Sequence, residues 1–160
     1  MAQANSTEEV LHIRQAADRV LATRHDEILN TTRAAIAEVL GREEDEVQPQ
    51  SSLMKDLNAE SLDFLDLLFR LESAFGIKIP RGGIQKATQG SLTEEEFQQN
   101  GVLTEAALER LRLLMPEVDA ARFKPGLTPR EIPMLFTPET FARLVAWRIG
   151  ESEAEKSASA

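Results

Sequence analysis

The stretch SLDFLDLLFRLESAF, residues 61–75, predicts an amphipathic helix that carries two apolar stripes. One stripe repeats at i, i+3, i+4, i+7 and i+11, the spacing of a helix face that packs on a core. It consists of Phe64, Leu67, Leu68, Leu71 and Phe75. The second stripe, on a neighbouring face, consists of Leu62, Leu65 and Phe69. Because one stripe is enough to hold a helix on its core, the second predicts either an unusually wide buried face or a docking surface ringed by acids.

The residues before this stretch also predict helix. Ser6 and Glu9 have the spacing of a capping box, and apolar residues recur at helical intervals from there to residue 40. Three polar residues at 24–26 predict a break in this long helix. Residues 42–60 then predict a polar loop that leads into the helix from residue 61.

The residues after Pro80 predict further short helices. Thr93 and Thr104 are expected to cap two of them, and Thr137 caps a last helix that we expect to end at Gly150. No segment alternates with the period of a β-strand over a useful length. The sequence therefore predicts an all-α fold.

The composition narrows the kinds of partner. There are 27 acidic and 18 basic residues, a net charge of −9, and this balance argues against nucleic acid and against an anionic membrane surface. A partner protein with a basic patch fits better. The lack of cysteine excludes thiol catalysis, disulfides and cysteine-ligated metals. No apolar run reaches the ~18 residues of a membrane span, and the N-terminus is polar, so we expect a cytoplasmic protein.

Ser61 lies where the polar loop meets the helix, in the sequence DLNAESLD at 56–63. A serine at this point would by itself be an ordinary helix N-cap. The surrounding sequence, however, resembles the acyl carrier protein family, whose attachment motif reads Asp-Leu-Gly-x-Asp-Ser-Leu and precedes an acidic amphipathic helix. The resemblance covers about residues 26–80, and residues 61–66 are similar to specialised carriers of long acyl chains.

The resemblance implies that 4′-phosphopantetheine is attached covalently to Ser61. Coenzyme A would donate the group, and a phosphopantetheinyl transferase would attach it. The chain would then carry acyl chains as thioesters for fatty-acid, lipid or polyketide synthesis, between acyl-activating, condensing and acyltransferase enzymes, without being an enzyme itself. A phosphodiester at this position is favoured physically, because a helix N-terminus presents free N–H groups and the positive end of the helix dipole.

The resemblance also assigns roles by position. The implied contacts to partner enzymes are Glu60, Leu62, Asp63, Leu65, Asp66, Phe69 and Glu72. The implied lining of an interior acyl site is Leu67, Leu71 and Phe75. No catalytic or metal-binding residue is expected. Glu60 departs from the family's Asp, and Asn58 departs from its Gly, although Asn accepts a positive φ better than most residues.

The chain is longer than a usual family member, and its organisation is open. We expect a single domain over residues 1–160, with a carrier core at 26–80, an insertion or added helices at 81–127, a closing helix within 128–150, and disorder at 1–5 and 151–160. In the other arrangement, residues 93–115 supply the last family helix.

Two other functions compete with the carrier. An unmodified helical adaptor would use the same acidic and apolar face of helix 61–75 to bind proteins. A small hydrolase using Ser61 would need an imidazole base, and His12 and His25 stand in no catalytic motif.

Overall fold

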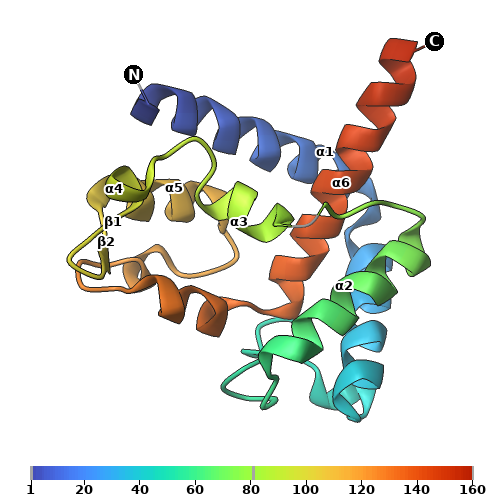
Figure 1. Ribbon diagram of the computed structural model, residues 1–160. Helices are drawn as coiled ribbons and strands as arrows, with labels where there is room; N and C mark the ends of the chain where they lie inside the picture. Colours follow the sequence, from blue (N-terminus) through green and yellow to red (C-terminus); the bar gives the residue numbers. More distant parts are fainter. Residues whose placement is uncertain (1, 81, 160) are drawn as a thin grey trace. The chain divides into compact units, whose positions relative to one another are not determined.

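The computed structural model describes residues 2–80 and 82–159, and side chains from 5–80 and 82–157 (Figure 1). The all-α prediction is confirmed, since the only strands in these ranges are two residues long. The helices are α1 (Ala2–Leu40), α2 (Ser61–Phe75), α3 (Gly83–Thr88), α4 (Glu94–Phe97), α5 (Glu105–Leu114) and α6 (Pro138–Ser159). The 3₁₀ turns are η1 (Glu44–Glu46), η2 (Ala120–Arg122) and η3 (Pro129–Leu135), and the strands are β1 (Gln98–Gln99) and β2 (Val102–Leu103).

The chain divides into two compact units, where we expected one domain. The first unit combines Met1–Gln15 with Pro80–Leu135, and the second, which we call the α2 unit, combines Ala16–Ile79 with Phe136–Ala160. Because α1 runs from Ala2 to Leu40, it supplies residues to both units. The α2 unit holds 17 acids and 10 bases, a net charge of −7 out of −9.

The α2 unit packs the later part of α1 together with α2 and α6 (Figure 1). Three phenylalanines join α2 to the start of α6: the ring of Phe64 stacks on Phe141 at 5.9 Å, and Phe136 meets both rings edge-on. The fully buried side chains of the α2 unit include Ile28, Ile36, Leu53, Leu67, Leu71 and Val145. The break that we predicted at 24–26 is present, since Arg24 has a non-helical φ of −128°.

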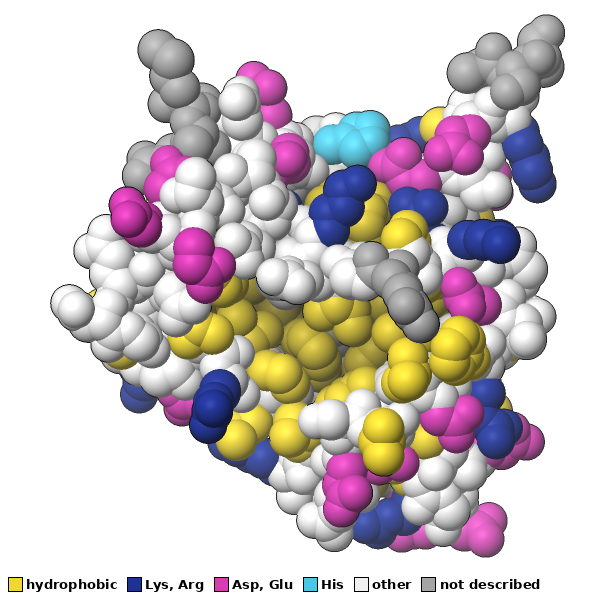
Figure 2. Space-filling view, in the orientation of Figure 1, with side chains coloured by type: hydrophobic (Ala, Val, Ile, Leu, Met, Phe, Trp, Pro, Cys, Tyr) yellow, Lys and Arg dark blue, Asp and Glu magenta, His cyan; other side chains and the backbone are white. Residues whose placement is uncertain are grey.

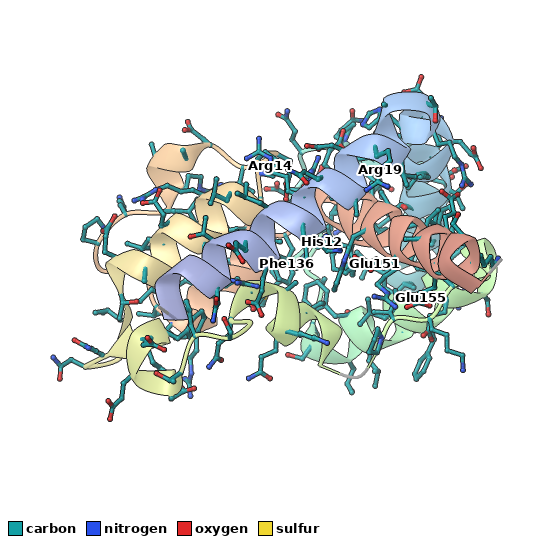
Figure 3. All side chains as sticks on the ribbon, turned by 90° about the horizontal axis from the view of Figure 1, so that it is seen from above. His12, Arg14, Arg19, Phe136, Glu151 and Glu155 are labelled. Atoms are coloured by element: carbon teal, nitrogen blue, oxygen red, sulfur yellow. The ribbon has the colours of Figure 1, made fainter. Side chains whose placement is uncertain are left out.

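Helix α6 continues past the residue at which we expected it to end. Gly150 lies inside α6, and residues 151–159, expected to be disordered, are helical. A Cβ added to Gly150 would lie only 3.0 Å from the backbone oxygen of Ala16. The glycine therefore allows α6 to approach α1 closely, which is a packing role and not a helix stop. Figure 3 shows Glu151 and Glu155 on the turns of α6 that follow; residue 160 lies outside the described residues.

The first unit is built around α5, with α3, α4 and the β1–β2 hairpin packed near it. Its fully buried side chains include Val10, Leu108, Leu111 and Phe123. Thr93 and Thr104 cap α4 and α5 as predicted, accepting the N–H groups of Glu96 and Ala107. Asn100 and Gly101, both at positive φ, form the turn between the two short strands.

The capping box expected at Ser6 and Glu9 is wrong, because α1 already begins at Ala2 and residues 2–5, expected to be disordered, are helical. Both side chains are engaged elsewhere in the first unit. The buried guanidinium of Arg110 donates to Ser6 Oγ (2.8 Å) and to Glu9 Oε1 (2.9 Å), and Ser91 N–H also donates to Glu9. No helix in the described part of the chain has the length and apolar character needed to cross a membrane.

Candidate functional site

The loop before α2 is anchored to the core of the α2 unit. Leu53, Leu57 and Ala59 are buried, although the loop is otherwise polar. The N–H of Leu53 donates to the carbonyl of Phe136 (3.1 Å), and the N–H of Ala59 donates to the carbonyl of Leu53 (2.8 Å). These contacts hold the end of the loop in one place just before the helix begins.

The turn into α2 differs by one residue from the expected cap. Glu60, in extended geometry, is the N-cap, and Ser61 is the first residue of the helix. Asp63 reaches back so that its Oδ2 accepts the N–H of Glu60 at 2.8 Å. Asn58 has a φ of +60°, a conformation that asparagine and glycine tolerate best. The substitution of asparagine for the family's glycine is therefore compatible with this turn.

The Ser61 side chain is exposed, and among the described residues its hydroxyl has no hydrogen-bond partner. A group esterified to this oxygen would stand in solvent at the start of a 15-residue helix. The helix dipole favours a negative charge there, and the first N–H groups of the helix are available to a phosphate oxygen. The residues present therefore fit a phosphodiester.

The second apolar stripe of α2 is exposed. Leu62, Leu65 and Phe69 have 77, 53 and 59% of their surface accessible, so the wider buried face that we considered is not formed. Isolated exposed leucines are common, but three in one stripe on a charged helix are not expected from folding alone. Figure 2 shows hydrophobic side chains beside Asp and Glu side chains where Figure 1 draws α2.

The first stripe of α2 faces the interior of the unit. Leu67 and Leu71 are fully buried, whereas Phe64, Leu68 and Phe75 are half-buried. The structure thus places two of the three residues expected to line an acyl site, Leu67 and Leu71, in the core. Phe75 lies at the edge of the core.

Three acids of the expected docking set bond within the chain. Asp63 accepts the Glu60 N–H described above, and Glu72 Oε2 accepts the N–H of Ile79 at 2.7 Å. Asp66 pairs with Arg70 at 3.4 Å, and the other side of the Arg70 guanidinium pairs with Glu38 of α1 at 2.7 Å. Sequence reasoning missed the Glu38–Arg70 pair, because the two residues are 32 positions apart.

A surface groove of about 620 Å³ lies between α1 and α2, beside Phe69. Five of its nine lining residues have small side chains, and the Glu38–Arg70 ion pair joins the two helices there. The lining residues are Thr31, Ala34, Ala35, Glu38, Asp66, Phe69, Arg70, Ser73 and Ala74. The groove and the exposed stripe therefore share Phe69.

The one histidine of the α2 unit holds two helices together. His25 Nε2 lies 3.0 Å from Glu139 Oε1 at the start of α6, and Nδ1 lies 3.1 Å from Asp26. The hydrogen bonds that the His25 ring donates to the carboxylates of Glu139 and Asp26 raise its pKa above the ordinary 6.5. Since both ring nitrogens contact carboxylates, this histidine is not placed to serve Ser61 as a base. The described residues contain no cluster of three or more His, Asp or Glu that could hold a metal ion.

Residues 30–94 match the protein family described as the phosphopantetheine attachment site. The chain is 48% identical over 56 residues to an acyl carrier protein of Borreliella burgdorferi, which covers 35% of this chain and 70% of that protein. It is 43% identical over 63 residues to an acyl carrier protein of Rubrobacter xylanophilus, a match that covers 39% of this chain and 78% of that protein. It is 41% identical over 63 residues to the acyl carrier protein AcpXL of Brucella melitensis, a match that covers 39% of this chain and 68% of that protein. No solved structure matches the chain significantly. With this extent of identity to the greater part of known carriers, the chain belongs to the acyl carrier protein family.

Proposed function

We propose that this protein carries acyl groups as thioesters on a 4′-phosphopantetheine arm attached to Ser61. One observation carries the proposal: Ser61 is an exposed serine that begins an amphipathic helix within the segment matched to the attachment-site family. When bound, the arm supplies the thiol that a chain without cysteine lacks.

The chain's own residues present the serine and stabilise the charge that follows. The buried Leu53 and Leu57 anchor the loop that leads to Ser61, and Ser61 itself lies at the surface. In the loading reaction, the Ser61 oxygen forms a bond to the phosphorus of coenzyme A next to pantetheine, and the bond to the adenosine bisphosphate breaks. The serine proton leaves to a base of the transferase. Because Ser61 begins α2, the helix N-terminus would stabilise the negative charge of the phosphodiester.

The partners in this proposal are the phosphopantetheinyl transferase and the acyl-activating, condensing and acyltransferase enzymes. They would meet the exposed face of α2 through its apolar anchors and the acids around them. The proposed contacts are Glu60, Leu62, Asp63, Leu65, Asp66, Phe69 and Glu72. The chain itself would not be an enzyme, and its cytoplasmic location stays a prediction.

The buried stripe of α2 supplies the proposed shelter for an acyl chain. Leu67 and Leu71 are in the core, and Phe75 lies at its edge. An acyl chain that enters between these side chains would exchange water for hydrocarbon, at roughly 0.8 kcal/mol for each buried CH₂ group. Long acyl groups would gain most from such a site.

The attachment is tested by mass spectrometry after the purified chain is incubated with coenzyme A and a broad-specificity phosphopantetheinyl transferase. We expect a mass increase of one phosphopantetheinyl group that Ser61→Ala abolishes. Ser157→Ala is the matched control, because Ser157 is an exposed serine of the same unit that lies outside α2. An unchanged mass, or an increase that survives Ser61→Ala, would overturn the proposal.

A second function, an unmodified adaptor, is favoured by the exposed stripe alone. It predicts that a partner binds through Leu62, Leu65 and Phe69 while the mass never changes. The same experiment therefore separates the two functions, since the adaptor has no use for coenzyme A.

A further inference from the structure

The exposed stripe of α2 is too small to form a protein interface alone. Three side chains of this size, each more than half exposed, offer on the order of 350 Å² of apolar surface. A specific interface buries about 800 Å² of surface on each partner, of which roughly 57%, about 450 Å², is apolar. A partner that docks at Ser61 must therefore cover further surface beyond Leu62, Leu65 and Phe69.

The groove between α1 and α2 lies next to the stripe and can supply this further surface. It shares Phe69 with the stripe, and its small side chains (Ala34 and Ala74 among them) leave room for a side chain from another protein. Along α2 it begins five residues after Ser61 and ends thirteen residues after it, about 8 to 20 Å at 1.5 Å per residue. A patch of about 800 Å² is about 30 Å across, so it covers both features.

The charges at the groove indicate the chemistry of the partner. The side chains of Glu38 and Asp66 are 71 and 54% exposed and both pair with Arg70, so these three residues together carry one negative charge. The α2 unit as a whole carries −7. A basic group is therefore attracted to the groove, and it can reach either carboxylate on the side that Arg70 does not occupy.

We propose that the enzyme that loads Ser61 docks across both helices. It inserts an apolar side chain beside Phe69 into the groove and places a basic group against Glu38 and Asp66. This inference rests on the proposed function, and it adds α1 to the docking surface. Two observations carry the inference: the exposed apolar area of the stripe is smaller than an interface needs, and the groove has an excess of negative charge.

The test fills the groove without touching the stripe or Ser61. Ala74 is exposed on α2 and lines the groove, so Ala74→Trp blocks it from an exposed position. Ala22→Trp is the matched control, because Ala22 is exposed on α1 outside the groove. With a broad-specificity transferase and coenzyme A, we expect Ala74→Trp to raise the KM for the apo chain at least tenfold with little change in kcat. Ala22→Trp should leave both constants unchanged, and circular dichroism confirms that each variant is folded.

A second measurement locates the contact directly. Adding the transferase to the ¹⁵N-labelled Ser61→Ala chain, which cannot be loaded, should shift amide resonances of residues 31–38 as well as those of 62–69. Shifts confined to 62–69, with KM unchanged in Ala74→Trp, would show that docking uses α2 alone and would overturn the inference. An equal KM rise in Ala22→Trp would also overturn it. If the wild-type chain is never loaded, the proposed function fails as well, which is a distinct result.

Discussion

Arg110 is a buried arginine that joins several parts of the first unit, and its replacement by methionine tests these contacts. The side chain is 1% exposed, and it connects α5 to the first turns of α1 and to α3. Its Nη1 donates to the carbonyl of Ser6 (2.9 Å), to Ser6 Oγ (2.8 Å) and to Glu9 (2.9 Å). Its Nε donates to the carbonyl of Ala87 at 3.0 Å. One guanidinium therefore joins three segments that are far apart in sequence.

The expected loss follows from what methionine would leave behind. The carbonyls of Ser6 and Ala87 would lose a donor in a buried setting, at about 1–3 kcal/mol each. The ion pair to Glu9 contributes less, because that carboxylate is 41% exposed and is screened by water. Methionine fills most of the volume, so no large cavity is added. We expect Arg110→Met to reduce the stability of the first unit by about 4 kcal/mol, the middle of the range for the two carbonyl losses taken together.

Hydrogen exchange measured by mass spectrometry is the suitable assay, because a chain with two units need not unfold in one step. Amides of residues 83–88 and 105–114 should exchange roughly a hundredfold faster or more, since 1.4 kcal/mol corresponds to about tenfold. Arg130→Met, at an exposed arginine of the same unit, should change exchange little. A change in Arg110→Met no larger than in Arg130→Met would refute the reasoning.

Gly90 offers an independent check of the same contact. A Cβ added at Gly90 would lie 2.5 Å from Arg110 Cζ and 2.5 Å from Glu9 Oε1, and its φ is +57°. Gly90→Ala should therefore destabilise the first unit both by this clash and by backbone strain of about 1 kcal/mol. In the Arg110→Met background only the strain and the contact to Glu9 remain, so the second substitution should cost less. Strictly additive effects would show that Arg110 does not occupy the place given to it here.

Three further predictions concern the α2 unit. His25 has a raised pKa because it bonds Glu139 and Asp26, so its contribution to stability is complete below about pH 6.5 and is lost as pH rises through the higher folded-state value. The stability difference between wild type and His25→Gln, from urea unfolding, should thus shrink between pH 6 and 8, and a constant difference would contradict this. If Leu67 and Leu71 line an acyl site, the melting temperature of the acylated protein should rise with chain length; equal values for short and long acyl groups would count against the site. Because the α2 unit carries −7, transferase association should slow as salt rises in stopped-flow measurements, whereas a rate independent of salt would exclude electrostatic steering.

Short sequence motifs predicted the structure correctly where the atoms that they contact lie only a few residues away. Thr93 and Thr104 cap helices through residues three positions away, and the break at Arg24 falls inside the predicted range. The β1–β2 hairpin was missed, although Asn100-Gly101 is a strong turn signal that could have indicated it. Its strands are only two residues long, so no alternating pattern supported the turn.

The predictions that were wrong involve atoms from distant segments. Ser6 and Glu9 have the spacing of a capping box, but Arg110 competes for the same oxygens from about a hundred positions away. Glycine is a residue type that often ends helices, but at Gly150 the lack of a side chain allows α6 to pack closely against Ala16. In both cases the residue type was informative and its tertiary partner decided its role.

At the candidate site too, the sequence did not indicate which acids of α2 bond to other residues of the chain. These bonds bear on the proposed docking of partner enzymes. Three acids form hydrogen bonds or ion pairs within the chain: Asp63, Asp66 and Glu72. Each therefore stabilises the fold in addition to any contact that it makes with a partner. Bonds of this kind hold the carboxylates in fixed positions while their charge still contributes to the field of the unit. The field can then guide the encounter over a distance of about 10 Å, whereas the lifetime of the complex depends on the apolar side chains that partners bury. If partner enzymes dock on α2 as proposed, the electrostatic attraction is common to all of them, and the fit around Leu62, Leu65 and Phe69 is specific to each.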